Sequence, residues 1–104
     1  MFRHYPAVSV GYIAHPSNVD DEELASFKAP LSIAAAEIDH LFPVDKRHKA
    51  EAVLMSSGYP YQINLYGMVE HGFCVRCDLS QKVEKYAKEA AFHQAVTWFN
   101  TWLL

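Results

Sequence analysis

Stretches of apolar residues and stretches that mix apolar with charged residues follow one another along this chain of 104 residues. Short runs rich in β-branched, aromatic or small apolar side chains are typical of strands that are buried on both faces. By this criterion we predict strands over Ala7–Ala14, Leu31–Ala36 and Tyr61–Tyr66. The segments between and after them place apolar residues at helical spacing. They predict helices over Val19–Phe27, Val44–Ser57 and Val83–Leu104.

Individual residues at the ends of these segments support the helices. Asp20 or Asp21 is predicted at the N-cap of the first helix, where a carboxylate accepts from backbone N–H groups. Pro43 suits the first position of the second helix and Gly58 its C-terminal end, which leaves residues 37–43 as a loop. The last helix is expected to bury a wide apolar face made of Tyr86, Ala90, Phe92, Val96, Phe99 and Leu103.

The predicted elements alternate strictly between strand and helix. Connections of helix length between successive strands are the signature of a parallel sheet with right-handed crossovers. The sequence has no internal repeat, no low-complexity segment and no linker. We therefore predict one α/β domain over residues 1–104, built on a three-stranded parallel sheet.

Charge and hydropathy narrow the classes of partner. The formal net charge is −3 with histidine neutral, which gives no electrostatic support for a nucleic-acid partner. No apolar run reaches the roughly 20 residues that a membrane span requires, and the first residues lack the apolar core of a signal peptide. The expectation is a soluble, cytoplasmic protein that binds neither nucleic acid nor membrane.

Two side chains with catalytic chemistry occupy equivalent places in the predicted topology. Asp39 lies in the loop after the second strand and His71 in the loop after the third. The carboxyl ends of neighbouring parallel strands meet at one rim of a sheet, where open α/β sheets place their active sites. An Asp followed by a His in successive loops is the acid-then-base order of an α/β-hydrolase triad. His15, at the end of the first strand, is expected to line a pocket at the same rim.

Three segments around this rim carry a resemblance to a known family. They are His15-Pro16-Ser17, the run Ala-Glu-Ile-Asp-His-Leu-Phe-Pro from Ala36 to Pro43, and Glu70-His71-Gly72-Phe73 with Arg76 and Asp78. Over roughly Val8 to Phe99 the chain resembles the C-terminal half of the dienelactone hydrolase family. The resemblance implies a partial α/β-hydrolase fold and hydrolysis of a small ester or lactone without a cofactor. It implies Asp39 as the acid, His71 as the base and Arg76 as a contact for a substrate carboxylate.

The nucleophile of that family is not found in this sequence. It is a cysteine on a strand-to-helix elbow in a Gly-x-Cys-x-Gly-Gly setting, and the chain contains neither this pattern nor Gly-x-Ser-x-Gly. Cys74 and Ser17 stand near the rim in sequence, but neither has the glycine framework that exposes a nucleophile. The spacing Cys74-x-x-Cys77 follows the last strand and has only His71 nearby as a further ligand. A redox or zinc site is therefore disfavoured, and no metal is expected.

An Asp–His pair without a nucleophile leaves other functions open. A lyase or isomerase needs only a base in a pocket, because proton abstraction forms no covalent intermediate. A small-molecule binding protein and a non-catalytic truncated subunit are further alternatives. In the hydrolase fold the first strand, residues 7–14, would pair with the strand that leads to the nucleophile. Without that strand, its uncharged edge is expected to be covered by a second copy in a homodimer or by a companion chain.

Overall fold

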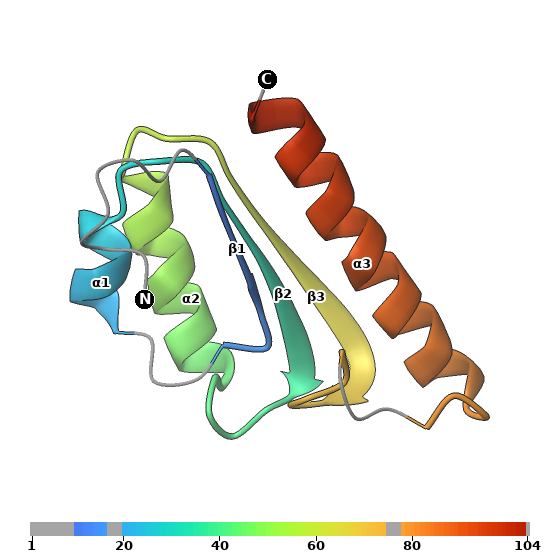
Figure 1. Cartoon of the computed structure of the whole chain (residues 1–104). Helices are drawn as coiled ribbons and strands as arrows, with labels where there is room; N and C mark the ends of the chain where they lie inside the picture. The colour runs from blue at the N-terminus through green and yellow to red at the C-terminus, as the bar shows by residue number, and fades with distance from the viewer. Residues whose placement is uncertain (1–9, 17–19, 75–77, 104) are drawn as a thin grey trace.

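The computed structural model describes residues 10–16, 20–74 and 78–103. The elements in chain order are β1 (Gly11–Ala14), α1 (Asp21–Ser26), β2 (Leu31–Ile38), α2 (Val44–Met55), β3 (Tyr61–Glu70) and α3 (Lys82–Trp102). The strands form one parallel sheet in the order β1-β2-β3. Helices α1 and α2 cover one face of this sheet and α3 covers the other (Figure 1). The predicted α/β fold with a three-stranded parallel sheet is confirmed.

Side chains of the central strand alternate between two cores, because successive residues of a strand point to opposite faces. Leu31, Ile33 and Ala35 pack with α1 and α2 in the first core. Ala34 and Ala36 lie in the second core, where α3 contributes two more alanines, Ala87 and Ala91. Alanine on both sides leaves little side-chain volume between the layers, so α3 packs close to the sheet.

The helix ends agree in part with the prediction. Asp20 is the N-cap of α1, and its Oδ1 accepts from the backbone N of Glu23 at 2.7 Å. Pro43 is the N-cap of α2 rather than its first helical residue, and this helix ends at Met55, two residues earlier than predicted. Gly58 follows with a φ of 83°, the left-handed conformation that glycine adopts without steric cost. The predicted start of the first strand and of the first helix lies outside the described residues.

Both β2 and β3 are longer than predicted. Glu37 and Ile38, predicted in a loop, continue β2, and residues 67–70 continue β3. The side chains of these added residues are mostly exposed. Sheet pairing joins backbone groups and does not require an apolar side chain, so the apolar runs mark only the buried part of each strand.

The predicted buried face of α3 is wrong. The side chains buried from this helix belong to Ala87, Ala91, Gln94 and Trp98. Tyr86, Phe92, Val96 and Leu103, all predicted on the buried face, are exposed. The alanine surface of β2 selects small residues opposite it, and a polar residue enters this core because it finds hydrogen-bond partners there.

That polar residue is Gln94, which is 7% exposed. Its Nε2 donates to the hydroxyl of Ser32 at 2.8 Å and to the carbonyl of Ile33 at 3.1 Å. The hydroxyl of Tyr66 donates to Gln94 Oε1 at 2.6 Å, and the Ser32 hydroxyl donates to Gln62 Oε1 at 3.1 Å. This network joins α3 to both β2 and β3, and its directional bonds set the position of the helix along the sheet.

Candidate active site

Asp39 and His71 come directly after the last residues of β2 and β3, at the same rim of the sheet. Oδ2 of Asp39 lies 2.8 Å from Nδ1 of His71, which is hydrogen-bonding distance. The side chain of Asp39 is fully buried, and that of His71 is 23% exposed. The structure therefore brings together the two residues that the sequence singled out, with the carboxylate inside and the imidazole at the surface.

The other oxygen of the carboxylate is held by its own turn. Asp39 Oδ1 accepts from the backbone N of Leu41 at 2.9 Å, and the carbonyl of Asp39 accepts from the backbone N of Phe42 at 3.2 Å. Phe42 is 2% exposed and anchors this turn in the core. With Nδ1 of His71 bound to Asp39, Nε2 is the ring nitrogen left to exchange a proton with a reacting group.

The imidazole of His71 sits on a tight turn at the end of β3. Its backbone N donates to the carbonyl of Ile38 at 3.3 Å, which ties the turn to the last residue of β2. Gly72 follows with a φ of 91°, a conformation that other residues rarely adopt. Phe73, 3% exposed, then returns the chain to the core. The turn thus presents the side chain of His71 between the exposed Glu70 and the buried Gly72 and Phe73.

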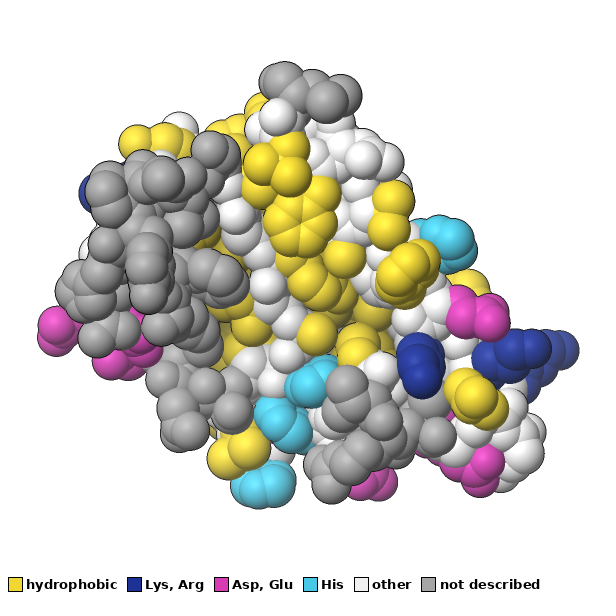
Figure 2. All heavy atoms as spheres, in the orientation of Figure 1, with side chains coloured by type: hydrophobic (Ala, Val, Ile, Leu, Met, Phe, Trp, Pro, Cys, Tyr) yellow, Lys and Arg dark blue, Asp and Glu magenta, His cyan; other side chains and the backbone are white. Residues whose placement is uncertain are grey.

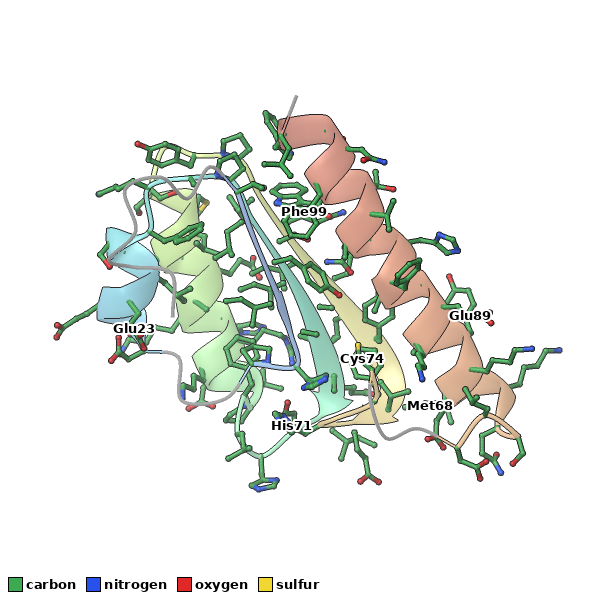
Figure 3. The ribbon with its side chains drawn as sticks, viewed as in Figure 1. Glu23, Met68, His71, Cys74, Glu89 and Phe99 are labelled. Atoms are coloured by element: carbon green, nitrogen blue, oxygen red, sulfur yellow. The ribbon has the colours of Figure 1, made fainter. Side chains whose placement is uncertain are left out.

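His15 reaches the same place from the end of β1. Its backbone N donates to the carbonyl of Ala34 at 2.7 Å, and its φ is 35°. Its ring lies 5.0 Å from the ring of His71 and 5.7 Å from that of Phe73, edge to face in both cases. Histidine side chains gather at this rim of the molecule in Figure 2, and Figure 3 labels His71 at the carboxyl ends of the strands.

Of the other site residues considered from the sequence, the structure describes only Cys74. Arg76, Ser17 and Cys77 fall outside the described residues. Cys74 is half-buried and packs against the α3 side of the core beside Tyr12 and Tyr66. Its side chain therefore belongs to the core cluster and is not presented on an exposed elbow. The predictions made for the other three residues stay predictions.

A hollow of about 300 Å³ lies beside His71. It is lined by Met68, Val69, Glu70, His71, Phe73 and Glu84. Its volume is at the lower end of the range for small-molecule sites. Two carboxylates in its wall disfavour an anionic group at this position by like-charge repulsion. A larger hollow of about 710 Å³ between β3 and α3 contains neither Asp39 nor His71, so size does not identify the site.

One residue at this rim was given no role of its own from the sequence. Glu37, predicted in a loop, is in β2, and its Oε1 accepts from the backbone N of Met68 at 2.7 Å. In the sequence Glu37 was part of the segment Ala36–Pro43 that carries the family resemblance, and this place alone does not distinguish a structural role from a solvated carboxylate.

The chain is similar to proteins of a known family. Residues 3–103 match the sequence profile of the dienelactone hydrolase family. Hydrolase tropI of Talaromyces stipitatus is 52% identical over 96 residues, which are 92% of this chain and 38% of that protein. Hydrolase pyvD of Aspergillus violaceofuscus is 47% identical over 102 residues, 98% of this chain and 42% of that protein. The chain thus spans about two fifths of the length of these relatives.

The fold is found in a crystal structure of a protein assigned as a dienelactone hydrolase from Klebsiella pneumoniae. The TM-score is 0.80 at 14% identity, and the match covers 96% of this chain and 45% of that one. At this identity the likeness concerns the fold. Among the described residues, no helix is long and apolar enough to cross a membrane.

Proposed function

The chain belongs to the dienelactone hydrolase family, and from this premise we propose that it supplies the acid–base half of an ester- or lactone-hydrolysing site. The observation that carries the proposal is the 2.8 Å contact between Oδ2 of the buried Asp39 and Nδ1 of the partly exposed His71. A carboxylate in this place holds the imidazole in one orientation and stabilises its charged form.

The chemistry proposed for His71 has two proton transfers. Nε2 takes the proton of a thiol or hydroxyl nucleophile as the nucleophile attacks the ester carbonyl, and a tetrahedral intermediate forms. The imidazolium then gives this proton to the alkoxide oxygen as the carbon–oxygen bond breaks, leaving an acyl group on the nucleophile. Water, activated by the same nitrogen, releases the acid and restores the nucleophile. Asp39 keeps its negative charge throughout.

The nucleophile in this proposal lies on a companion segment outside these 104 residues. The sequence has no Gly-x-Cys-x-Gly or Gly-x-Ser-x-Gly pattern, and its relatives are more than twice as long. Within the described residues β1 pairs with β2 alone, and its four residues carry no charge. Such an edge pairs readily with another strand. A companion that pairs with β1 would lie beside His15 and so near His71.

The surface next to that edge supports the same arrangement. Hydrophobic side chains gather over the face between β1 and α3 in Figure 2, and Figure 3 labels Phe99 there. Tyr12 of β1 meets Phe99 at 6.5 Å between ring centroids, while Phe92 is 66% exposed and Leu103 is 57% exposed. Contiguous apolar surface of this kind marks an interaction site. We propose that the companion covers it.

The proposed substrate is a small, neutral ester or lactone. The hollow beside His71 holds a small molecule, and Glu70 and Glu84 in its wall disfavour an anion there. The alternative drawn from the family is an anionic substrate whose carboxylate contacts Arg76. Dihydrocoumarin and p-nitrophenyl acetate are suitable neutral probes.

The proposal is tested by reconstitution. Hydrolysis of dihydrocoumarin is measured with the 104-residue chain alone, and again after adding the part of Talaromyces stipitatus hydrolase tropI that this chain does not match. We expect no turnover from the chain alone and turnover from the mixture. Activity of the mixture should be lost with His71→Ala and kept with His48→Ala, a control histidine exposed on α2.

Sedimentation velocity of the same samples identifies what covers β1. A complex of the two polypeptides supports the proposal, whereas a stable homodimer that stays intact in the mixture contradicts it. Turnover by the chain alone, lost with His71→Ala, would place the nucleophile inside this chain and also contradict it. If the two polypeptides form a complex but no turnover depends on His71, the proposed hydrolysis is contradicted.

A second candidate function rests on the completeness of the Asp39–His71 pair. A histidine base with its orienting carboxylate is sufficient for proton abstraction next to a carbonyl, as in a lyase or isomerase. This candidate is distinguished by hydrogen–deuterium exchange at the carbon beside the carbonyl of a small ketone or lactone in heavy water. Exchange that depends on His71 without hydrolysis would favour it.

A further inference from the structure

The pairing of β2 with β3 changes register just before the candidate site. Ala36 pairs with Tyr66, whereas Ile38 pairs with Glu70. Between these pairs β2 has the single residue Glu37, and β3 has residues 67–69. The extra residues form a bulge in β3, and a bulge of this kind re-aims the strand that follows it.

The bulge decides which residue of β3 stands opposite Asp39. If the register of Ala36 and Tyr66 continued, Asp39 would face Val69, and His71 would lie two residues further along. Two residues of a strand span roughly 7 Å, which is beyond hydrogen-bonding reach. In the observed register His71 stands opposite Asp39, and the bond from its backbone N to the carbonyl of Ile38 holds it there. The Asp39–His71 contact thus depends on the bulge.

The tip of the bulge is Met68, whose backbone is in an unfavourable conformation. Its φ is 64°, in the left-handed region that costs energy for a residue with a Cβ. Its side chain is 71% exposed, so burial of this side chain does not hold it there. Figure 3 labels Met68 and His71 at the same end of the sheet. An interaction of the backbone itself must therefore offset the strain.

Glu37 supplies that interaction. Its Oε1 accepts from the backbone N of Met68 at 2.7 Å, the short distance of a hydrogen bond to a charged acceptor. Glu37 is the one residue of β2 opposite the bulge, and the Cβ position of Gly67 would lie 3.6 Å from the same oxygen. The carboxylate therefore lies against the inserted residues and satisfies the backbone N–H at their tip.

We propose that Glu37 is a positioning residue that holds the bulge in β3 and so brings His71 opposite Asp39. The carboxylate touches no reacting atom in this role. It acts through Met68 on the register of the strand. The consequence for catalysis rests on the proposed function, whereas the effect on the Asp39–His71 hydrogen bond does not.

The test compares Glu37→Ala with Glu37→Gln in the 104-residue chain. The first readout is the downfield NMR signal of the His71 Nδ1 proton, assigned by its absence in His71→Ala. We expect Glu37→Ala to weaken or abolish this signal. Glu37→Gln, which keeps an oxygen acceptor for the Met68 N–H, should preserve it. Glu51→Ala removes an exposed carboxylate from α2 and serves as the control.

A second variant separates loss of register from loss of folding. Met68→Gly in the Glu37→Ala background removes the strain at the positive φ, because glycine adopts this conformation freely. We expect the signal of His71 to return in the double variant. In the reconstituted hydrolase, Glu37→Ala should lower kcat/KM by roughly 10- to 100-fold, mainly through kcat, as expected for misplacement of about 1 Å or more.

The outcomes distinguish this inference from the proposed function. An unchanged His71 signal in folded Glu37→Ala would overturn the inference, whether or not the mixture hydrolyses the lactone. A signal lost in Glu37→Ala and kept in Glu37→Gln would support it even if no hydrolysis is found. Loss in both variants without return in the double variant would mean that Glu37 does not act through Met68, which also overturns it.

Discussion

The imidazole ring of His15 lies 5.0 Å from the ring of His71 and meets it edge to face. The two histidines come from the ends of β1 and β3, which are separated by the central strand. The ring of His15 also meets that of Phe73, at 5.7 Å between ring centroids. His15 thus joins the turn that carries His71 to the strand that the proposed companion would pair with.

His15→Ala is expected to loosen the candidate base. Removing the ring takes away one wall of the His71 side chain, and an imidazole that samples more orientations is a poorer proton acceptor. We expect roughly a tenfold loss of kcat/KM in the reconstituted mixture, in the range of a small misplacement. His15→Phe keeps a ring in contact with His71 and Phe73 and should retain more activity. An equal loss of kcat/KM in His15→Ala and His15→Phe would contradict a role for the ring contact in activity.

Asp39→Asn is expected to remove most activity while the fold remains. An amide in this place no longer stabilises the charged imidazole, and it can hold the ring in the wrong tautomer. The expected loss of kcat is on the order of 10³- to 10⁴-fold. Far-ultraviolet circular dichroism should be unchanged, and Asp45→Asn, at an exposed carboxylate in the first turn of α2, should keep full activity. Near-normal turnover in Asp39→Asn would exclude the acid from the mechanism.

Gln94→Leu is expected to destabilise the chain despite placing an apolar residue in a core. The substitution leaves the Ser32 hydroxyl without the Nε2 donor from which it accepts, and the Tyr66 hydroxyl without the Oε1 acceptor to which it donates. Unsatisfied buried polar groups cost about 1–3 kcal/mol of unfolding free energy. Urea unfolding should show this loss, while Asn100→Leu, at an exposed amide on the same helix, should stay within about 0.5 kcal/mol of the parent.

Alkaline pH is expected to destabilise the chain through two partly buried phenols, those of Tyr12 and Tyr66. Burial raises the pKa of Tyr12 and of Tyr66 above the ordinary value. The folded state therefore keeps these protons at a pH where the unfolded chain has lost them. Their contribution to stability is complete below about pH 10 and is lost as the pH rises above that value.

Urea unfolding from pH 8 to 11.5 measures this effect. Tyr12 donates to the carbonyl of Ala91 at 3.0 Å, so Tyr12→Phe should lower stability at pH 8. Its unfolding free energy should then fall less steeply above pH 10 than that of the parent. Tyr59→Phe, at a residue 39% exposed, is the control and should keep the parent slope. Parallel slopes in Tyr12→Phe and the parent would contradict the assignment.

Much of this architecture follows from local features of the sequence. The buried strands are short apolar runs, and parallel pairing follows from connections of helix length. The first helix is capped by Asp20, because its carboxylate accepts from the N–H of Glu23. The placement of Asp39 and His71 at one rim follows as well, because parallel neighbours end on the same side. Each of these features depends either on residues close in sequence or on the order of the strands and helices. The pattern of apolar and polar residues along the chain predicts both.

The features that local pattern did not predict depend on contacts between distant residues. The exposed ends of β2 and β3 carry no apolar signal, yet their backbones pair. The buried face of α3 was mispredicted because it depends on residues distant in sequence, namely the alanines of β2 and the partners of Gln94, which lie 28 to 62 residues from it. Phe92 is more hydrophobic than Gln94, yet Gln94 is buried and Phe92 is exposed. The residues that face each side chain across the sheet decide which of the two is buried.

The sequence by itself determined the fold class, the parallel order of the strands and the placement of Asp39 and His71 at one rim of the sheet. The reason is that periodicity, caps and connection lengths act over a few residues. Only the tertiary structure decided that Asp39 and His71 share a hydrogen bond, through a bulge whose strain at Met68 is offset by Glu37. Strand register is the physical reason, because it is chosen by contacts across the sheet and a shift of two residues separates the pair.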